Sequence, residues 1–153
     1  PRSNGNTEWK RINQYKVPGE PIAKGRPRAR TFGGRIVQTY TPKRTKDFEN
    51  RVRVYTAAQK VPDDVPIRML MRFVFKRPKR LMRKKDPDGL IPHTAKPDGD
   101  NVEKAVLDAL CGVLYRDDSQ VQSSSWEKFY SEKGREPRVE IQVYVMDEGE
   151  DSC

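Results

Sequence analysis

The stretch from Pro66 to Arg77, PIRMLMRFVFKR, constrains the fold most strongly, because its side chains alternate between two kinds. One set is uniformly apolar, and the other carries the charges. The apolar set is Ile67, Met69, Met71, Phe73 and Phe75, and the other is Arg68, Leu70, Arg72, Val74 and Lys76. A period of two residues is typical of a β-strand, whose successive side chains point to opposite faces. The stretch therefore predicts a strand with one buried face.

Further elements are predicted around this strand. Residues 15–31 contain a short strand that leaves through Gly and Pro residues into a basic segment. Residues 30–41 predict a hairpin that turns at Gly33 and Gly34. A helix is predicted over residues 41–60, before the alternating strand at 66–77. Two further strands are predicted after it, over residues 117–132 and 137–146.

Strands at both ends of the chain with two helices between them indicate an α/β (α+β) fold, in which a mixed β-sheet packs with two main helices. A length of 153 residues fits one domain with its own core, so a single domain is expected over residues 1–153. Residues 1–14 and 147–153 are expected to be flexible ends, because polar terminal segments are often poorly ordered.

The charge balance predicts a polyanionic partner. The chain carries 31 Lys and Arg residues against 22 Asp and Glu residues, a formal net charge of +9 at pH 7. Nucleic acid is the first candidate. A membrane surface is a weaker one, because no stretch approaches the roughly 18 apolar residues of a spanning helix. Cys111 and Cys153 supply neither a disulfide framework nor a cysteine metal site, which favours a reducing, cytoplasmic setting. We expect no membrane partner and no organic cofactor.

A second helix is predicted to begin near Asn101. Asp100 stands where an N-cap belongs, and Gly112 where such a helix could stop. At about 100° per residue, Asp100, Lys104 and Asp108 form a polar stripe roughly opposite the apolar face. The apolar residues at helical spacing are Val102, Ala105, Val106, Ala109, Leu110 and Val113.

Carboxylates gather at both ends of this helix in an otherwise basic chain. Asp98 and Asp100 stand at its start, and Asp117 and Asp118 open the next strand. A loop, a helix start and a strand start can converge on one point, and Mg²⁺ prefers such oxygen ligands. Bound Mg²⁺ could generate a hydroxide and stabilise the leaving oxygen in phosphodiester cleavage. Lys104, one turn after Asp100, could contact the scissile phosphate.

Simpler roles for the same residues stay open on this reasoning. Asp100 can cap the helix, Asp108 can pair with Lys104, and Asp117 with Asp118 can form a turn. Each residue taken alone fits such a structural role. The group of acids beside a basic loop fits a metal site better.

The spacing of Asp98 and Asp100 can also be compared with two other kinds of site that use paired acidic residues. An EF-hand loop counted from Asp98 would need Gly at its sixth position and Glu at its twelfth, where Glu103 and Ala109 stand instead, so that site is excluded. A D-x-D site for nucleotide sugars fits the motif, but it explains neither the positive charge nor the small size of the chain.

Residues 96–121, KPDGDNVEKAVLDALCGVLYRDDSQV, closely resemble the signature of RusA-type Holliday-junction resolvases, a bacterial and phage family of small endodeoxyribonucleases. That signature is Pro-Asp-x-Asp-Asn, a Lys four residues after the second Asp, an Asp-Ala-Leu, and an Asp-Asp-x-Gln. GRPRAR, TYTPKRTKDFENRVR and PRVEIQVYV are similar to phage-type members, so the resemblance runs from about Gly19 to Val145. Gly99 departs from the family, whose members often carry an apolar residue there.

The resemblance implies a homodimer of α/β subunits that cuts branched DNA, the four-way junction above all. It implies symmetric cuts with Mg²⁺, or Mn²⁺ as a substitute, that leave ligatable nicks. The family's essential acids map onto Asp98, Asp100 and Asp118, which would hold the metal, and its important lysine maps onto Lys104. Asp117 is adjacent and could assist as a ligand.

Two basic segments are candidates for phosphate contacts, which usually supply most of the affinity for DNA. The competing interpretation is that both are solvated surface loops. Nothing in them resembles a base-reading motif, and the family analogy favours recognition of shape over sequence. The candidates are Lys76, Arg77, Lys79, Arg80, Arg83, Lys84 and Lys85 in the first segment, and Arg26, Arg28, Arg30, Lys43, Arg44 and Lys46 in the second.

The sequence indicates only general roles for the single histidine and for four apolar or aromatic residues. His93 is expected to be structural or to contact a phosphate. Trp126, Phe129 and Tyr130 are expected to pack in the core or at a dimer contact. Leu107 falls on the polar side of the second helix, which suggests a subunit contact.

Three functions follow from these expectations. The first is a metal-dependent endonuclease that resolves four-way DNA junctions in a bacterium or a phage-infected cell. The second is a DNA-structure-binding protein that keeps the fold without catalysis. The third is a nuclease of the same fold with a broader preference for flaps or forks.

Overall fold

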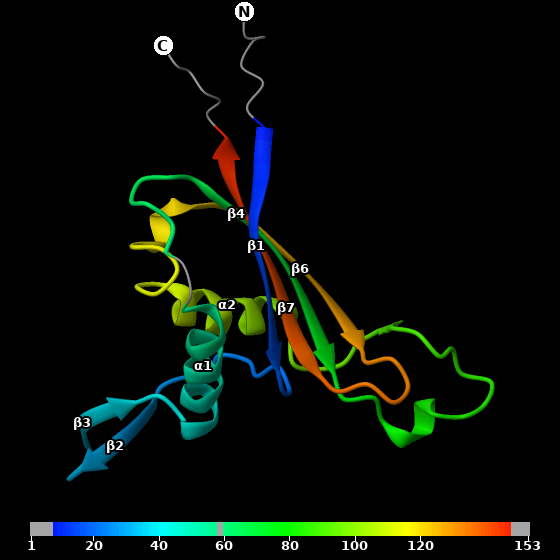
Figure 1. The fold of residues 1–153 in the computed structure, drawn as a ribbon. Coiled ribbons are helices and arrows are strands. Elements are labelled where there is room, and N and C mark those ends of the chain that lie inside the picture. Colours follow the sequence, from blue (N-terminus) through cyan, green and yellow to red (C-terminus); the bar gives the residue numbers. More distant parts are fainter. Residues whose placement is uncertain (1–7, 58–59, 148–153) are drawn as a thin grey trace, which may run out of the picture.

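The computed structural model describes residues 8–57 and 60–147 and confirms a mixed α+β fold (Figure 1). A five-stranded sheet has the strand order β1-β7-β4-β6-β5. β4 pairs in parallel with β6 and antiparallel with β7, which makes the sheet mixed, as expected. The strands are β1 (Glu8–Pro18), β4 (Ile67–Phe75), β5 (Ile91–Pro92), β6 (Val121–Tyr130) and β7 (Arg138–Asp147).

Two helices, α1 (Lys43–Thr56) and α2 (Gly99–Leu110), pack with this sheet and close the core. The alternating apolar residues of β4, from Ile67 to Phe75, are all buried, as their period of two predicts. The helices contribute Phe48, Val52, Val102, Ala105, Val106, Ala109 and Leu110 to the same core. Because the apolar stripe of α2 is buried, its polar residues must face outward.

The ends of two elements differ from the sequence-based expectation. Residues 8–14, expected within a flexible end, belong to β1, where they pair with β7. Backbone pairing along that edge of the sheet orders a polar segment that its composition alone would leave loose. Asp147, also expected in a flexible end, is the last residue of β7 and pairs with Glu8, and the rest of the expected ends, residues 1–7 and 148–153, lie outside the described residues. The strand expected from residue 117 begins at Val121, because Asp118–Gln120 forms a short 3-10 turn, η3.

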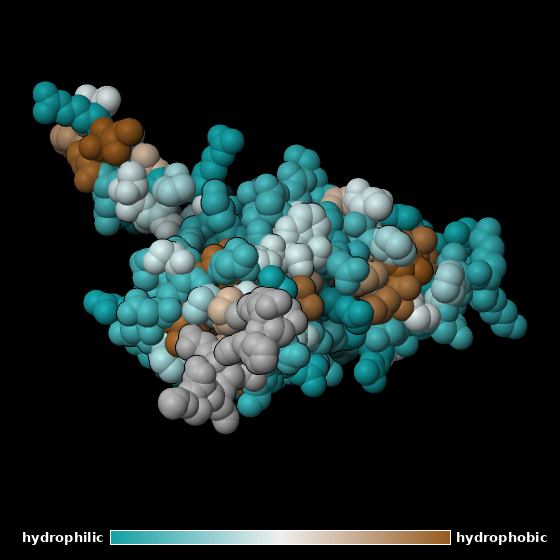
Figure 2. All heavy atoms as spheres, turned by 90° about the horizontal axis from the view of Figure 1, so that it is seen from above, coloured by the Kyte–Doolittle hydropathy of each residue, from teal (hydrophilic) through white to brown (hydrophobic). Residues whose placement is uncertain are grey.

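A separate two-stranded sheet, β2 (Arg28–Phe32) and β3 (Arg35–Tyr40), confirms the predicted hairpin. Gly33 and Gly34 form its turn with φ angles of 61° and 79°, the left-handed conformation that a tight hairpin turn requires. The hairpin stands away from the main sheet (Figure 1). Figure 2 shows a hydrophobic patch on the projecting arm of an otherwise largely hydrophilic surface, and Phe32, Ile36 and Val37 are the exposed apolar residues there.

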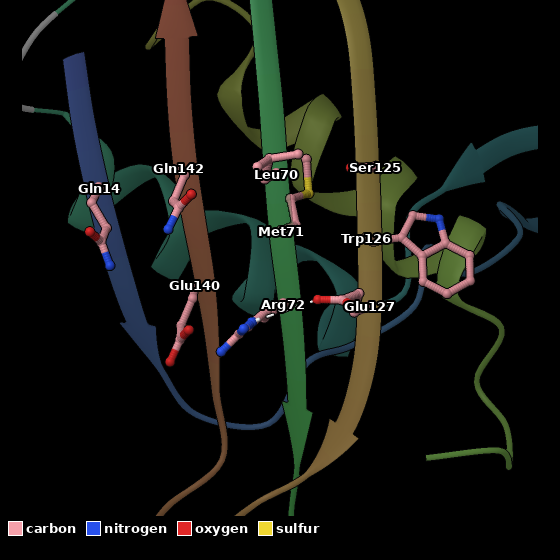
Figure 3. Close-up of a pocket in the computed structure, with 9 residues that line it drawn as sticks. All are labelled: Gln14, Leu70, Met71, Arg72, Ser125, Trp126, Glu127, Glu140 and Gln142. Carbon is pink, nitrogen blue, oxygen red and sulfur yellow. Dashed lines mark ion pairs between the residues drawn. The ribbon is translucent and has the colours of Figure 1, made fainter. Parts of the chain in front are cut away.

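The face of the sheet opposite the core carries uncharged polar side chains and charged side chains of both signs (Figure 3). Leu70 is exposed at its centre, and Arg72 lies 3.7 Å from Glu127 in an ion pair across neighbouring strands. A shallow hollow of about 480 Å³ opens there between β1, β7, β4 and β6. The same alternation of β4 that buries one face therefore leaves the other as solvent-facing surface.

Candidate active site

The start of α2 presents two acidic residues to solvent. The helix begins at Gly99, so the N-cap is Asp98 rather than Asp100, which lies in the first turn. The expectation that Asp100 caps the helix is therefore wrong. The Asp98 side chain makes no capping hydrogen bond, and both carboxylates are exposed. Both are thus free to bind a ligand beside the positive end of the helix dipole.

Gly99 fixes the position of this acidic turn against the sheet. The residue is buried, and a Cβ atom there would overlap the six-membered ring of Trp126 on β6. Trp126 in turn stacks on Phe73 of β4, with ring centroids 6.3 Å apart. The departure from the family pattern at Gly99 therefore permits close packing of the helix start on an indole ring. Trp126 packs against the core side of the sheet, in line with the expectation of a packing role.

A lysine on β6 holds the loop that leads to Asp98. The Lys128 ammonium group donates hydrogen bonds of 2.8 Å to the carbonyl oxygens of Ala95 and Pro97. The backbone N–H of His93 donates to the Lys128 carbonyl oxygen at 3.1 Å. Strand β6 thus ties down both ends of the segment immediately before the acids, a support that the sequence did not indicate.

Replacing Lys128 with Met is expected to reduce both stability and DNA cleavage. The substitution removes two charge-assisted hydrogen bonds, so the free energy of unfolding should fall by about 1–3 kcal/mol in urea titrations. Lys133→Met is the matched control, because Lys133 also donates to two carbonyl oxygens, those of Arg83 and Asp86. A positioning role for Lys128 requires the cleavage rate to fall much further than in the control; equal losses would contradict it.

The two acids after α2 have different surroundings. Asp117 caps η3, where it accepts hydrogen bonds from the backbone N–H and hydroxyl of Ser119, and these bonds lower the pKa of its carboxyl group. Asp118 lies 3.4 Å from the hydroxyl group of Tyr115, whose pKa is raised by burial and by the negative charge of Asp118. Asp117 is therefore occupied by a local structural role, and Asp118 is the freer of the two carboxylates.

Asp118 lies beside the C-terminal half of α2, whereas Asp98 and Asp100 lie at the start of that helix. The hydroxyl group of Tyr115, its neighbour, donates a 2.8 Å hydrogen bond to the carbonyl oxygen of Leu107. Leu107 is seven residues after Asp100, a rise of about 10 Å along the helix axis. Among residues 8–57 and 60–147, no three His, Cys, Asp or Glu side chains lie close enough to hold a metal ion. Asp98, Asp100 and Asp118 therefore do not form such a group within the described part of one chain, and their role as metal ligands stays a prediction.

The exposed face of α2 lies between Asp98 and Asp100 at the start of the helix and Asp118 beside its C-terminal half. Asp108 pairs with Lys24 at 3.1 Å, and Lys24 also bonds Glu49 of α1 at 2.8 Å. The suggested pair between Asp108 and Lys104 is therefore not formed. Lys104 is exposed and has no ion pair among the described residues, so its ammonium group is available to a phosphate. Leu107, expected at a subunit contact, packs against the chain's own core.

One residue of the first basic segment has a structural role instead of a DNA-binding one. Arg77 is buried, and its guanidinium group donates to the carbonyl oxygens of Leu81, Pro87, Gly89 and Ser131. A planar group with five donors can hold several turns of a loop at once. Exposed cations of this segment are Lys76, Lys79, Arg80, Arg83, Lys84 and Lys85, and those of the second segment are Arg26, Arg28, Arg30, Lys43, Arg44 and Lys46.

His93 is buried between two aromatic rings, those of Phe75 and Tyr130, with centroid separations of 4.2 and 4.6 Å. Burial, reinforced by the positive charge of Lys128, lowers the pKa of its imidazole group. The imidazole group therefore binds a proton more readily in the unfolded chain than in the folded one. The free energy of unfolding should fall as the pH drops below about 6.5, the ordinary pKa of histidine. Urea titrations from pH 7.5 to 5.5 should show this decline in the wild type and a flatter profile in His93→Phe.

A family model and a relative match most of this chain. The family model described as endodeoxyribonuclease RusA matches residues 18–144. A relative from Bacillus subtilis (strain 168), the uncharacterized protein YqaN, is 38% identical over 138 residues, which cover 85% of this chain and 94% of the relative. The fold and the family match define a DNA-cutting enzyme. The chain belongs to the RusA endodeoxyribonuclease family. No described helix is long and apolar enough to cross a membrane.

Proposed function

We propose that the protein is a divalent-metal-dependent, structure-selective endodeoxyribonuclease that resolves four-way (Holliday) junctions by paired, symmetric cleavage. This reaction would serve recombination, repair or phage DNA processing in the cytoplasm of a bacterium or a phage-infected cell. The observation that carries the proposal is the family match over residues 18–144 together with an exposed acidic turn at the start of α2. A net charge of +9 supports a polyanionic substrate.

Asp98, Asp100 and Asp118 are the proposed acids, with Mg²⁺ as the metal and Mn²⁺ as a possible substitute. Their oxygen ligands suit such hard cations, which activate water and stabilise a leaving oxygen when bound. Their separation along α2 in one chain does not fit a three-carboxylate site. Asp117 is a poorer candidate than Asp118, because its carboxylate already caps η3.

A homodimer offers a way to bring these acids together. β5 pairs with β6 only at Phe129 and Tyr130, and the Lys128 carbonyl oxygen accepts from the backbone N–H of His93, so the outer edge of β6 from Val121 to Glu127 has no strand partner among the described residues. Such an edge can pair with a second strand. Antiparallel pairing of two copies of this edge about a twofold axis would carry Asp118 toward Lys128 of the partner subunit.

Lys128 is the residue that holds the carbonyl oxygen of Pro97, next to Asp98. In this arrangement each of two equivalent sites would combine Asp98 and Asp100 of one subunit with Asp118 of the other. Two equivalent sites match the two equivalent strands that a four-way junction presents for paired cleavage.

Lys104 and the two basic segments are proposed to bind the DNA backbone. Lys104 lies on the exposed face of α2, one turn after Asp100, and can balance charge on the scissile phosphate. Arg77 is left out of this proposal because it is buried. The proposed phosphate contacts are Lys76, Lys79, Arg80, Arg83, Lys84 and Lys85 in the first segment and Arg28, Arg30, Lys43 and Arg44 in the second.

Cleavage assays on immobile and mobile four-way junctions, with linear duplex, flap and fork controls, test this function. We expect paired symmetric nicks in Mg²⁺ or Mn²⁺ and none in EDTA, with little cutting of linear duplex. Comparable cutting of flaps or forks would instead indicate the broader nuclease. Junction binding without cutting in either metal would favour the non-catalytic binder, which the separation of the acids within one chain makes the main alternative.

A further inference from the structure

A pocket of about 400 Å³ lies beside the acidic turn, and three of the proposed phosphate contacts, Arg28, Arg44 and Lys76, line it. It opens between the segment that precedes β2, the start of α1, the end of β4 and the loop before α2. Pockets of this size take small organic ligands. Its lining includes Pro97, the residue immediately before Asp98. A ligand in the pocket would therefore lie next to the proposed cleavage site.

The walls of the pocket are predominantly cationic. Arg28, Arg44, Lys76 and Lys96 line it, against a single carboxylate, that of Glu20. Glu20 accepts a hydrogen bond of 3.1 Å from the backbone N–H of Lys76, so its negative charge is already engaged by the protein. Four cations drawn from four separate segments leave the pocket with a net positive charge, which favours an anionic ligand.

The N-terminus of α1 adds a second feature that favours an anion. Pro42, Arg44 and Thr45 line the pocket at the first turn of this 14-residue helix. Pro42 is the N-cap and supplies no side-chain hydrogen bond, and the first turn contains no acidic residue. The first backbone N–H groups of a helix need partners, and its dipole is positive at this end. Such an uncapped helix start is a suitable place for a phosphate.

The third feature is the aromatic side of the pocket. His93, Phe75 and Tyr130 line it, and the imidazole is stacked between the other two rings. The Nδ1 atom of His93 is buried and has no hydrogen-bond partner among the described residues. A buried polar atom without a partner is costly, so a ligand that supplies one would be favoured. Phosphate-binding walls beside an aromatic, partly polar lining suit a nucleotide better than an inorganic anion.

We propose that this pocket takes one unpaired nucleotide of the DNA strand at the branch point, with its phosphate at the start of α1 and its base toward His93. The inference rests on the proposed function and deepens it, because it names the part of the substrate that is read next to the acids. A base at a branch point is less firmly stacked than one inside a duplex, so it costs less to extrude. The pocket would thereby distinguish a branch from a continuous duplex.

The single histidine of the chain gives a direct test without DNA cleavage. Thymidine 5′-monophosphate is titrated into the wild-type protein while the His93 imidazole signals are followed by proton NMR. We expect a saturable shift, a much smaller response to thymidine or inorganic phosphate alone, and about tenfold weaker binding in Arg44→Gln. No shift, an equal response to inorganic phosphate, or unchanged binding in Arg44→Gln would overturn the proposal.

Lys60→Gln is the matched control, because it removes one positive charge near the other end of α1, outside the pocket. It should bind the nucleotide like the wild type. Unchanged His93 signals in the ligand-free variants establish that each is folded.

A second measurement separates failure of the pocket from failure of the proposed function. Four-way junctions carry 2-aminopurine next to the branch point, and the wild-type protein is added without divalent metal. We expect fluorescence to rise on binding, with the rise lost in Arg44→Gln and kept in Lys60→Gln. Junction binding without any rise overturns the pocket while the function stands. Absence of junction binding overturns the function, and the nucleotide titration then decides the pocket alone.

Discussion

Asp100→Asn is expected to abolish cleavage of four-way junctions while junction binding is kept or strengthened. The carboxamide has the size of the carboxylate but lacks the charge that a hard cation requires. A metal contributes several kcal/mol to transition-state stabilisation, and each 1.4 kcal/mol is about tenfold in rate, so a loss of at least about 100-fold is expected. Removing a negative charge near phosphates should not weaken binding. Single-turnover cleavage and gel-shift titrations measure the two effects.

Asp108→Asn is the matched control for this prediction. Asp108 lies on the same outer face of α2, two helical turns further on, but pairs with Lys24 within its own chain. Its substitution should leave cleavage within a few-fold of the wild type, because a partly exposed ion pair contributes only about 0–1 kcal/mol. Cleavage that survives in Asp100→Asn would remove this residue from the proposed site.

Gly99→Ala is expected to destabilise the protein, although helix propensity alone predicts the opposite. Ala is favoured over Gly in a helix by about 1 kcal/mol. The added methyl group would overlap the Trp126 ring, however, and forced overpacking costs about 1–3 kcal/mol. Cleavage should fall as well, because the shifted turn carries Asp98 and Asp100. Urea titrations and single-turnover cleavage of the same preparations check both expectations.

Two further variants isolate the contact between Gly99 and Trp126. Gly89→Ala is the control, because a Cβ atom there meets nothing within 4 Å, and its stability should change little. In a double-mutant cycle with Trp126→Leu, the Gly99→Ala substitution should cost much less than it does alone, because the smaller side chain relieves the overlap. Stabilisation by Gly99→Ala alone would show that the helix start is not fixed by this packing.

Elements with a strong local pattern could be predicted from the sequence. The alternation in β4, the apolar stripe of α2 and the paired glycines of the hairpin depend on the residues of each element alone, so these elements could be predicted from them. The polar start of β1 carries no such pattern. Its order comes from pairing with β7, a strand more than 100 residues away in the sequence.

The family motif in the sequence indicates the candidate acids directly, and their role stays a prediction. Their arrangement could not be predicted from the sequence. The position of Asp118 depends on the buried Tyr115. The hydroxyl group of Tyr115 donates a hydrogen bond to the carbonyl oxygen of Leu107 and places η3 beside the C-terminal half of α2. Such a contact leaves no period or spacing in the sequence.

The structural roles of two basic side chains, Arg77 and Lys128, depend on hydrogen bonds to backbone carbonyl oxygens. Arg77 belongs to a run of cations that looks solvent-exposed, yet it is buried among carbonyl groups from residues 81, 87, 89 and 131. Lys128 holds the loop before Asp98 from a strand 30 residues further along the chain. Backbone acceptors carry no side-chain signature, so neither role was predictable from residue types.

The central claim, that acids from both ends of α2 act together across two subunits, is tested most directly by mixing two inactive variants. Asp100→Asn and Asp118→Asn subunits, carrying different affinity tags, are co-expressed and the heterodimer is purified through both tags. Its activity is then measured on a four-way junction with Mg²⁺, beside both variant homodimers.

A heterodimer of this kind contains one site with all its acids intact, formed by Asp100 of one subunit and Asp118 of the other. The account predicts that it nicks one strand of the junction, whereas neither variant homodimer cuts. If each site were built within a single chain, both sites of the heterodimer would be damaged. A heterodimer as inactive as its parents, beside a wild-type enzyme that cuts, would contradict the account.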